Sequence, residues 1–158
     1  SILRSLEEIF LSDFEHIRPI FTSSWLDSRI GLAPLNLRKF LLQNIERAKK
    51  EIIVYNQAIS DTEILEALSQ KIKNWVHIEL CQSSKSSTWS DYHDIPLFTS
   101  DSPYLHAKIF LIDTDNIIIW SANLTSNALD NNREIMIKIE NNVNFSQQIK
   151  NLYNIDCK

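Results

Sequence analysis

The chain has 158 residues, the length of a single domain, and its hydrophobic content of 44% is sufficient for a buried core. A single glycine, together with the absence of CxxC and HExxH motifs, excludes a glycine-rich phosphate-binding loop and a recognisable zinc motif. The net charge of −4 argues against a chain-wide attraction to nucleic acid, but it is compatible with a local basic cleft.

The first half of the sequence alternates between helical and strand patterns. Apolar residues at helical spacing predict three helices, over residues 5–18, 37–48 and 60–72. Ser60 and Glu63 have the spacing of a capping box at the start of the third helix. Compact or alternating apolar runs predict strands over residues 30–33, 52–55 and 75–81, with Trp75 expected in the core. The next segment, 82–103, is rich in Ser and Asp and is typical of a long surface loop.

The second half carries the densest strand signals. Residues 105–113 and 117–121 predict two strands, which the turn residues 114–116 join as a hairpin. Residues 134–140 predict a further strand, and residues 143–153 predict a closing helix. Because helices alternate with strands and one pair of strands is antiparallel, we predict an α/β fold with a mixed sheet flanked by helices on both faces.

Signals for location are few. No apolar run approaches the ~20 residues of a membrane span, so we expect no transmembrane segment, and the first 20 residues show no secretory signal. Two cysteines, Cys81 and Cys157, are too few for a disulfide framework, and we interpret Cys81 as a small core residue. These features favour a reducing, cytoplasmic compartment. The chain begins with Ser1, so we expect it to be a piece of a longer protein.

Polar residues occur in pairs, spaced two apart, at the ends of three predicted strands. The pairs are His106 with Lys108, Ser121 with Asn123, and Asn132 with Glu134. Residues two apart on a strand share a face, so the members of a pair point in one direction. Polar groups at the ends of otherwise buried strands are costly unless they are paired or used. The pairs therefore define a candidate site.

These residue types suit cleavage of a phosphodiester. An imidazole such as that of His106 can attack phosphorus and form a phosphohistidine, which divides one difficult displacement into two easier ones. A lysine ammonium and amide donors can stabilise charge on the non-bridging oxygens without a metal or another cofactor. Glu134 is a candidate for fixing the tautomer of His106. In-line displacement also needs a general acid on the leaving-group side, and one histidine cannot occupy both sides of the phosphorus.

The same residues match a family signature. Residues 106–123 read His-Ala-Lys, four residues, Asp113, six residues, and then Trp-Ser-Ala-Asn. This segment resembles the HxK(x)4D(x)6GSxN signature of the phospholipase D superfamily, and the segment 132–134 resembles the NxE that follows it. The resemblance extends less specifically over residues 29–155. We therefore divide the chain into an N-terminal helix and linker, residues 1–28, and a phospholipase D-like half-domain, residues 29–158.

The resemblance implies a role for each residue of the motif. His106 is the nucleophile or the general acid, Lys108 and Asn123 bind the phosphate, and Ser121 and Asn132 support them. Asp113 and Glu134 belong to the same catalytic set. However, Asp113 has the opposite strand parity from His106, so we expect it either to act structurally or to support the site residues without touching the phosphate. The resemblance implies no metal ion and no cofactor.

One position departs from the family pattern. Trp120 stands where the family has a glycine, a residue that permits close approach of the backbone. We expect the bulky indole to narrow the site or to re-aim Ser121, which would reduce or redirect activity.

The single motif also implies a partner. Members of this family bring two such motifs together, from one chain or from a symmetric dimer, so that two histidines flank one phosphate. The segment 6–14 resembles the helix that follows the first motif in two-motif members. We therefore expect the C-terminal half of a longer protein, paired with the N-terminal half of that protein. A homodimer of one-motif chains is the alternative.

Three functions remain open from the sequence. The first is hydrolysis or transfer at a phosphodiester of a phospholipid, through a phosphohistidine. The second is a nuclease that uses the same site, against which the acidic balance of the chain weighs slightly. The third is a non-catalytic half that serves dimerisation or partner binding, with Trp120 marking a decayed site.

Overall fold

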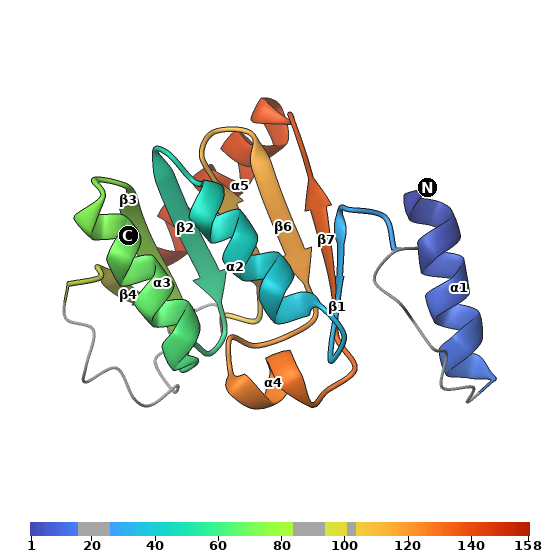
Figure 1. The fold of residues 1–158 in the computed structure, drawn as a ribbon. Coiled ribbons are helices and arrows are strands. Elements are labelled where there is room, and N and C mark those ends of the chain that lie inside the picture. Colours follow the sequence, from blue (N-terminus) through green and yellow to red (C-terminus); the bar gives the residue numbers. More distant parts are fainter. Residues whose placement is uncertain (16–25, 84–93, 101–103) are drawn as a thin grey trace.

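Figure 1 shows the computed structural model, which describes residues 1–15, 26–83, 94–100 and 104–158. Its centre is a seven-stranded sheet with the strand order β1-β7-β6-β5-β2-β3-β4. The strands are β1 (Ile30–Leu32), β2 (Glu51–Asn56), β3 (His77–Ser83), β4 (Leu97–Ser100), β5 (Lys108–Ile112), β6 (Asn116–Trp120) and β7 (Ile135–Ile139). The pairs β2–β3 and β3–β4 are parallel and the other pairs are antiparallel, so the sheet is mixed.

Helices cover both faces of this sheet. α2 (Leu37–Arg47) and α3 (Thr62–Lys73) pack on one face, and α5 (Val143–Cys157) packs on the other. The core beneath α2 and α3 includes Leu41, Ile64 and Phe110, whereas the core beneath α5 includes Ile149 and Tyr153. The predicted α/β class, a mixed sheet flanked by helices on both faces, is confirmed.

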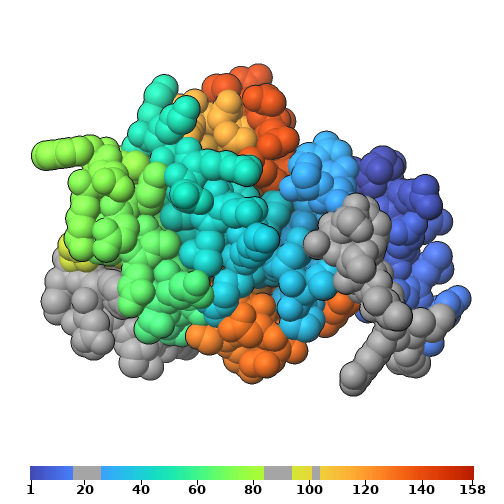
Figure 2. All heavy atoms as spheres, in the orientation of Figure 1, coloured from blue at the N-terminus to red at the C-terminus, as the bar shows by residue number. Residues whose placement is uncertain are grey.

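α1 (Ile2–Phe14) lies outside the edge strand β1, at the side of the molecule in Figures 1 and 2. Its buried Ile9 packs against Ile30 and Leu32. The helix begins three residues before the predicted start because the side chain of Ser1 caps its first turn. The predicted end of this helix, at residue 18, lies outside the described residues.

The register of the strands brings the candidate residues to one end of the sheet. Asn56 pairs with Lys108 across β2 and β5, and Trp120 pairs with Met136 across β6 and β7. The carboxyl ends of β2 and β6 therefore meet the amino ends of β5 and β7. We call this the site end; it is the lower end of the sheet in Figure 1, beside the short helix α4 (Ser126–Asp130).

Some local predictions are wrong. Trp75 is not in the core: it has a positive φ of 65° in the turn between α3 and β3, and its side chain is 94% exposed. Asp61, rather than Ser60, caps α3 by accepting a hydrogen bond from the Ile64 N–H. The predicted loop 82–103 contains the strand β4, while its residues 84–93 and 101–103 lie outside the described residues.

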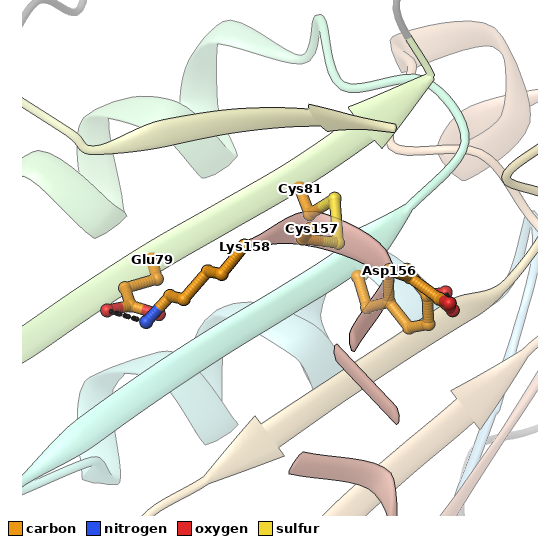
Figure 3. The surroundings of a disulfide bond; sticks show 6 residues. Glu79, Cys81, Asp156, Cys157 and Lys158 are labelled. Carbon is orange, nitrogen blue, oxygen red and sulfur yellow. Dashed lines mark hydrogen bonds and ion pairs between the residues drawn. A yellow bond between two sulfur atoms is a disulfide. The ribbon is translucent and has the colours of Figure 1, made fainter. Parts of the chain in front are cut away.

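A disulfide joins Cys81 of β3 to Cys157 at the end of α5, as Figure 3 shows. Cys81 is buried in the core, as predicted, but the disulfide itself was not expected from a count of two cysteines. The two cysteines are 76 positions apart in sequence, yet α5 returns across β3 and brings their Cα atoms to 6.1 Å. Lys158 forms an ion pair with Glu79 at 2.8 Å beside the disulfide. The end of α5 is thus attached to the sheet by a covalent bond and an ion pair.

Candidate active site

His106 and Lys108 lie side by side at the site end of the sheet. Lys108 is the first residue of β5, and His106 precedes the strand by two positions. The Lys108 Nζ atom is 3.4 Å from His106 Nε2 and 3.2 Å from the His106 carbonyl oxygen. His106 is exposed, whereas Lys108 is only 8% exposed. The imidazole is therefore open to a ligand while the ammonium is held against it.

The environment of Lys108 acts on its charge and on the neighbouring imidazole. Burial lowers the pKa of Lys108 because the ammonium loses solvation, while the charge of Glu134 raises that pKa by a smaller amount. An ammonium has only hydrogen-bond donors, so its contact with His106 Nε2 requires a lone pair on that nitrogen. The contact favours the tautomer of His106 with its proton on Nδ1.

Glu134 organises the neighbouring polar groups. The Ser121 hydroxyl and the Asn132 side-chain amide donate to its carboxylate, the latter at 3.1 Å. The same Ser121 hydroxyl accepts from the Ile135 N–H at 3.1 Å. In the described part of the chain, no hydrogen bond joins Glu134 to His106, so the expected fixing of the tautomer by this carboxylate is not seen. Glu134 instead orients Ser121 and Asn132, and its charge acts on Lys108.

Asn123 follows β6 at the same end of the sheet. It is partly buried, and its Oδ1 atom is buried without a hydrogen-bond partner among the described residues. A buried polar atom without a partner costs free energy, and functional sites are a common reason for one. The unpaired atom is an acceptor, so a phosphate oxygen would have to be bound by the NH2 group of the same side chain.

Asp113 lies at the other end of β5, away from the other candidates. Its carboxylate accepts hydrogen bonds from the N–H groups of Lys49, Lys50 and Glu51, at 3.0, 2.7 and 3.3 Å. Asp113 adopts a positive φ of 56° in the turn between β5 and β6, a conformation that Asp tolerates better than most residues. It therefore fastens the β5–β6 turn to the α2–β2 connection, and it does not join the groups around His106.

Trp120 does not line the site. Its side chain is 6% exposed and lies in the core beneath α2 and α3, where its ring meets Phe110 edge to face at 5.7 Å. Successive strand residues face opposite sides, so the indole and the Ser121 side chain leave the chain in different directions. The expectation that the indole narrows the site is wrong for this reason.

Sequence reasoning missed two residues that contact the site. Gln57 follows β2 and accepts a hydrogen bond from Lys108 Nζ at 3.2 Å. The ring of Tyr104 stacks on that of His106, with a centroid distance of 6.4 Å and an interplanar angle of 27°. The spacing of Tyr104, two residues before His106, is a signal that predicts a shared face. Gln57 gives no such signal, because only the β2–β5 register brings it to Lys108.

Other features bear on cofactors and membranes. Within the described ranges, no group of three or more His, Cys, Asp and Glu side chains is arranged to hold a metal ion. The helices of the described chain include none with the length and hydropathy of a membrane span.

A hollow of about 440 Å³ between α2 and α3, on the face seen in Figure 2, is lined by residues such as Leu42, Gln43 and Ala67 and by no candidate residue.

Residues 41–156, more than half of the chain, match the family model described as the PLD-like domain of cardiolipin synthase. The chain belongs to the phospholipase D superfamily. The motif read from the sequence and the mixed sheet agree with this membership. Phospholipase D superfamily members are typically enzymes that process phosphodiesters, and they commonly pair two halves or dimerise. No curated protein matches the chain.

Solved structures share the phospholipase D fold. The phospholipase D family member Nuc from Salmonella typhimurium has a TM-score of 0.74 and 22% identity, over 80% of this chain and 91% of that one. Polyphosphate kinase from Porphyromonas gingivalis has a TM-score of 0.75 and 16% identity, over 98% of this chain and 26% of that one. Phosphatidylserine synthase from Haemophilus influenzae has a TM-score of 0.60 and 15% identity, over 80% and 36%. At these identities the likeness concerns the fold alone.

Proposed function

We propose that this chain supplies one half of a phosphodiesterase site that works through a phosphohistidine on His106. The observation that carries the proposal is the 3.4 Å contact between Lys108 Nζ and Nε2 of an exposed His106 imidazole. This contact favours an unprotonated Nε2 and holds a cation beside it, where it can meet a phosphate oxygen. The reaction requires neither a metal ion nor an organic cofactor, so a chelator should leave turnover unchanged.

The reaction has two displacements at phosphorus. In the first, the Nε2 lone pair of His106 forms a bond to phosphorus while the bond to the leaving oxygen breaks, and an imidazolium on the far side gives that oxygen a proton. In the second, a water or alcohol oxygen attacks phosphorus, its proton passes to the same far-side imidazole, and the P–N bond breaks. Lys108 and Asn123 stabilise the negative non-bridging oxygens in both steps. Ser121, Asn132 and Glu134 form the hydrogen-bonded support beside them.

The far-side imidazole comes from a second phospholipase D-like half. One histidine cannot be both the nucleophile and the opposed acid in an in-line displacement, so the site is incomplete in one copy of this chain. We propose the N-terminal half of a longer protein as this partner and residues 29–158 as the folded C-terminal half, with residues 1–28 as a helix and linker. Under this proposal the purified chain is inactive alone and gains activity when the other half is added. If this chain is active without the other half, and its specific activity rises with its own concentration, the homodimer is supported instead.

We favour a phospholipid as the substrate. The family model that matches is described by cardiolipin synthase, an observation that supports a lipid phosphodiester without deciding it. The test uses this chain together with its partner half, which we call the assembled protein. It is given phospholipid vesicles or a single-stranded oligonucleotide, and the products of phosphodiester cleavage or transfer are measured. His106→Asn is the matched control, since the exposed imidazole can be replaced without opening the core. We expect the assembled protein to turn over the phospholipid and the His106→Asn variant to show no turnover.

Nucleic acid is the second candidate substrate, and Tyr104 is the observation that favours it. Its ring is 56% exposed beside His106 and offers a surface on which a base could stack. Turnover of the oligonucleotide but not of the vesicles would establish this alternative. If the assembled protein turns over neither substrate, the third hypothesis is supported, namely a non-catalytic half for dimerisation or partner binding.

The disulfide bears on the compartment in which the protein works. A disulfide that persists is typical of an oxidising compartment, whereas the composition led us to expect the reducing cytoplasm. We propose the oxidising location. Alkylation of the protein in its native cells followed by mass spectrometry distinguishes the two: a bonded Cys81–Cys157 pair supports this proposal, and two alkylated thiols support the cytoplasm.

A further inference from the structure

We infer that Tyr104 and Gln57 are further parts of the site: Tyr104 donates its phenolic proton to an oxygen of the bound phosphate, and Gln57 positions Lys108. This inference rests on the proposed function, because that function places the phosphate beside Lys108 and His106. It adds one residue that touches the ligand and one that acts through its neighbour.

A directed chain of hydrogen bonds links the three side chains. Lys108 Nζ donates to Gln57 Oε1 at 3.2 Å, and Gln57 Nε2 donates to the Tyr104 hydroxyl oxygen at 2.6 Å. The ammonium can only donate, so the amide atom facing it is the oxygen and the atom facing Tyr104 is the nitrogen. The Tyr104 oxygen is therefore an acceptor in this chain. Its own proton is left for a different acceptor.

The position of Tyr104 directs that proton toward the site. Tyr104, His106 and Lys108 are spaced two apart, and the Tyr104 ring stacks on the imidazole at a centroid distance of 6.4 Å. The ring is also the exposed member of the hydrogen-bonded chain, while Lys108 is its buried end. A phosphate that binds between the ammonium and Nε2 thus lies within the group of side chains that Tyr104 borders.

Charge strengthens this donor. Hydrogen bonds in a chain polarise one another, so the positive Lys108 makes the Gln57 amide a better donor and the Tyr104 hydroxyl a better donor in turn. The acceptor is an anionic oxygen, and a hydrogen bond to a charged group contributes on the order of 10- to 100-fold in affinity.

Gln57 is well placed to hold Lys108. Its backbone carbonyl accepts from the Ser83 N–H at 3.1 Å, which fixes the residue to the end of the neighbouring strand β3. Apart from Gln57, the hydrogen-bond acceptors near the ammonium in the described chain are the carbonyl oxygen and Nε2 of His106. Without Gln57, one acceptor is lost and the ammonium is free to turn away from the phosphate position.

The experiment measures by calorimetry the binding of orthovanadate, a mimic of the pentacoordinate phosphoryl-transfer state, to the assembled protein. Tyr104→Phe retains the ring and removes only the hydroxyl. Gln57→Met retains the length of the side chain and removes both polar atoms. Tyr55→Phe is the matched control, because the Tyr55 hydroxyl bonds Asp156 of α5 on the opposite face of the sheet. Thermal unfolding verifies that each variant is folded.

We expect Tyr104→Phe and Gln57→Met each to weaken orthovanadate binding about tenfold or more, and Tyr55→Phe to change it less than about twofold. The double variant should lose no more than the larger single effect, because the two residues act in one chain. Unchanged affinity in Tyr104→Phe, or no binding to the wild type, overturns the inference. If orthovanadate binds and Tyr104→Phe weakens this binding, but the assembled protein turns over neither substrate, then Tyr104 contacts the bound anion while the proposed function fails. The two failures are therefore distinguishable.

Discussion

The two ends of β5 hold the two charged residues of one motif in opposite ways. At the site end, the hydrogen-bond partners of the Lys108 ammonium among the described residues are neutral: the Gln57 amide and the His106 carbonyl and imidazole. Burial lowers the pKa of this ammonium. At the far end, three backbone N–H groups of residues 49–51 meet the Asp113 carboxylate. The first arrangement keeps a cation ready for an anionic ligand. The second uses an anion to fasten two turns together.

This contrast shows that a residue can belong to the motif without taking part in the chemistry. Five residues of strand separate the two ends by about 16 Å, at ~3.3 Å per residue, which is too far for a shared contact with one phosphate. Trp120 belongs to the same motif, and its side chain is in the core. We therefore expect substitutions at Trp120 and Asp113 to change stability, and substitutions at Lys108 and Glu134 to change the chemistry.

The largest effect is expected for Trp120→Ala. The indole fills the core against Phe110, and loss of a buried aromatic side chain costs about 3–5 kcal/mol. Urea unfolding should show this loss, with no gain of activity in the molecules that remain folded. Unchanged stability with faster turnover would mean that the indole obstructs the site after all.

Lys108→Met tests the reactive end. The ammonium stabilises the non-bridging oxygens, so its removal should lower kcat/KM of the assembled protein about 10²- to 10³-fold while the fold is retained. Lys150→Met, which removes an ion pair between α5 and Glu51, is the matched control and should leave kcat/KM within about threefold. Equal activity losses in the two variants would contradict a special role for Lys108.

Asp113→Ala tests the structural end. Three backbone donors, two of them in exposed residues, lose a charged acceptor, and the loss of hydrogen bonds to a charged group costs about 1.5–3 kcal/mol in the free energy of unfolding. Asp115→Ala in the same turn should cost about 0.5 kcal/mol or less. A variant at Asp113 that keeps its stability but loses turnover would place this carboxylate in the chemistry instead.

The smallest effect is a change of pH dependence in Glu134→Gln. The phosphate-binding form of Lys108 is protonated, and its lowered pKa means that this form is lost at a lower pH than for an ordinary lysine. Glu134 raises the Lys108 pKa, so its neutralisation should lower that pKa further. In the pH profile of kcat/KM, the fall in activity at alkaline pH should therefore move to lower pH. A fall that stays in place or moves to higher pH would show that Glu134 does not act on Lys108.

Much of the fold was predictable because it depends on local periodicity. The apolar patterns of α2, β2, β6 and α5 each identify an element, with boundaries that differ by a few residues at most. The candidate pairs were predictable for the same reason, since alternation along a strand places His106 and Lys108 on one side. Strand parity also separated Asp113 from His106 and Lys108, and its carboxylate contacts the backbone of residues 49–51.

The remainder depends on contacts between distant segments. The pairing of Cys81 with Cys157 follows from the return of α5 across β3, and a count of cysteines carries no information about that path. α4 has five residues, too few to show a helical period. Gln57 reaches Lys108 only through the antiparallel β2–β5 register. Trp75 lies outside the core because a single positive φ turns it away from the strand.

The most direct test of the central claim is to trap the covalent intermediate. The assembled protein is mixed with substrate, quenched in alkali to preserve a P–N bond, and digested for mass spectrometry. We predict a phosphoryl adduct on His106 that is absent in His106→Asn. Turnover without an adduct on His106, or an adduct found on the partner half alone, would contradict the assignment of His106 as the nucleophile.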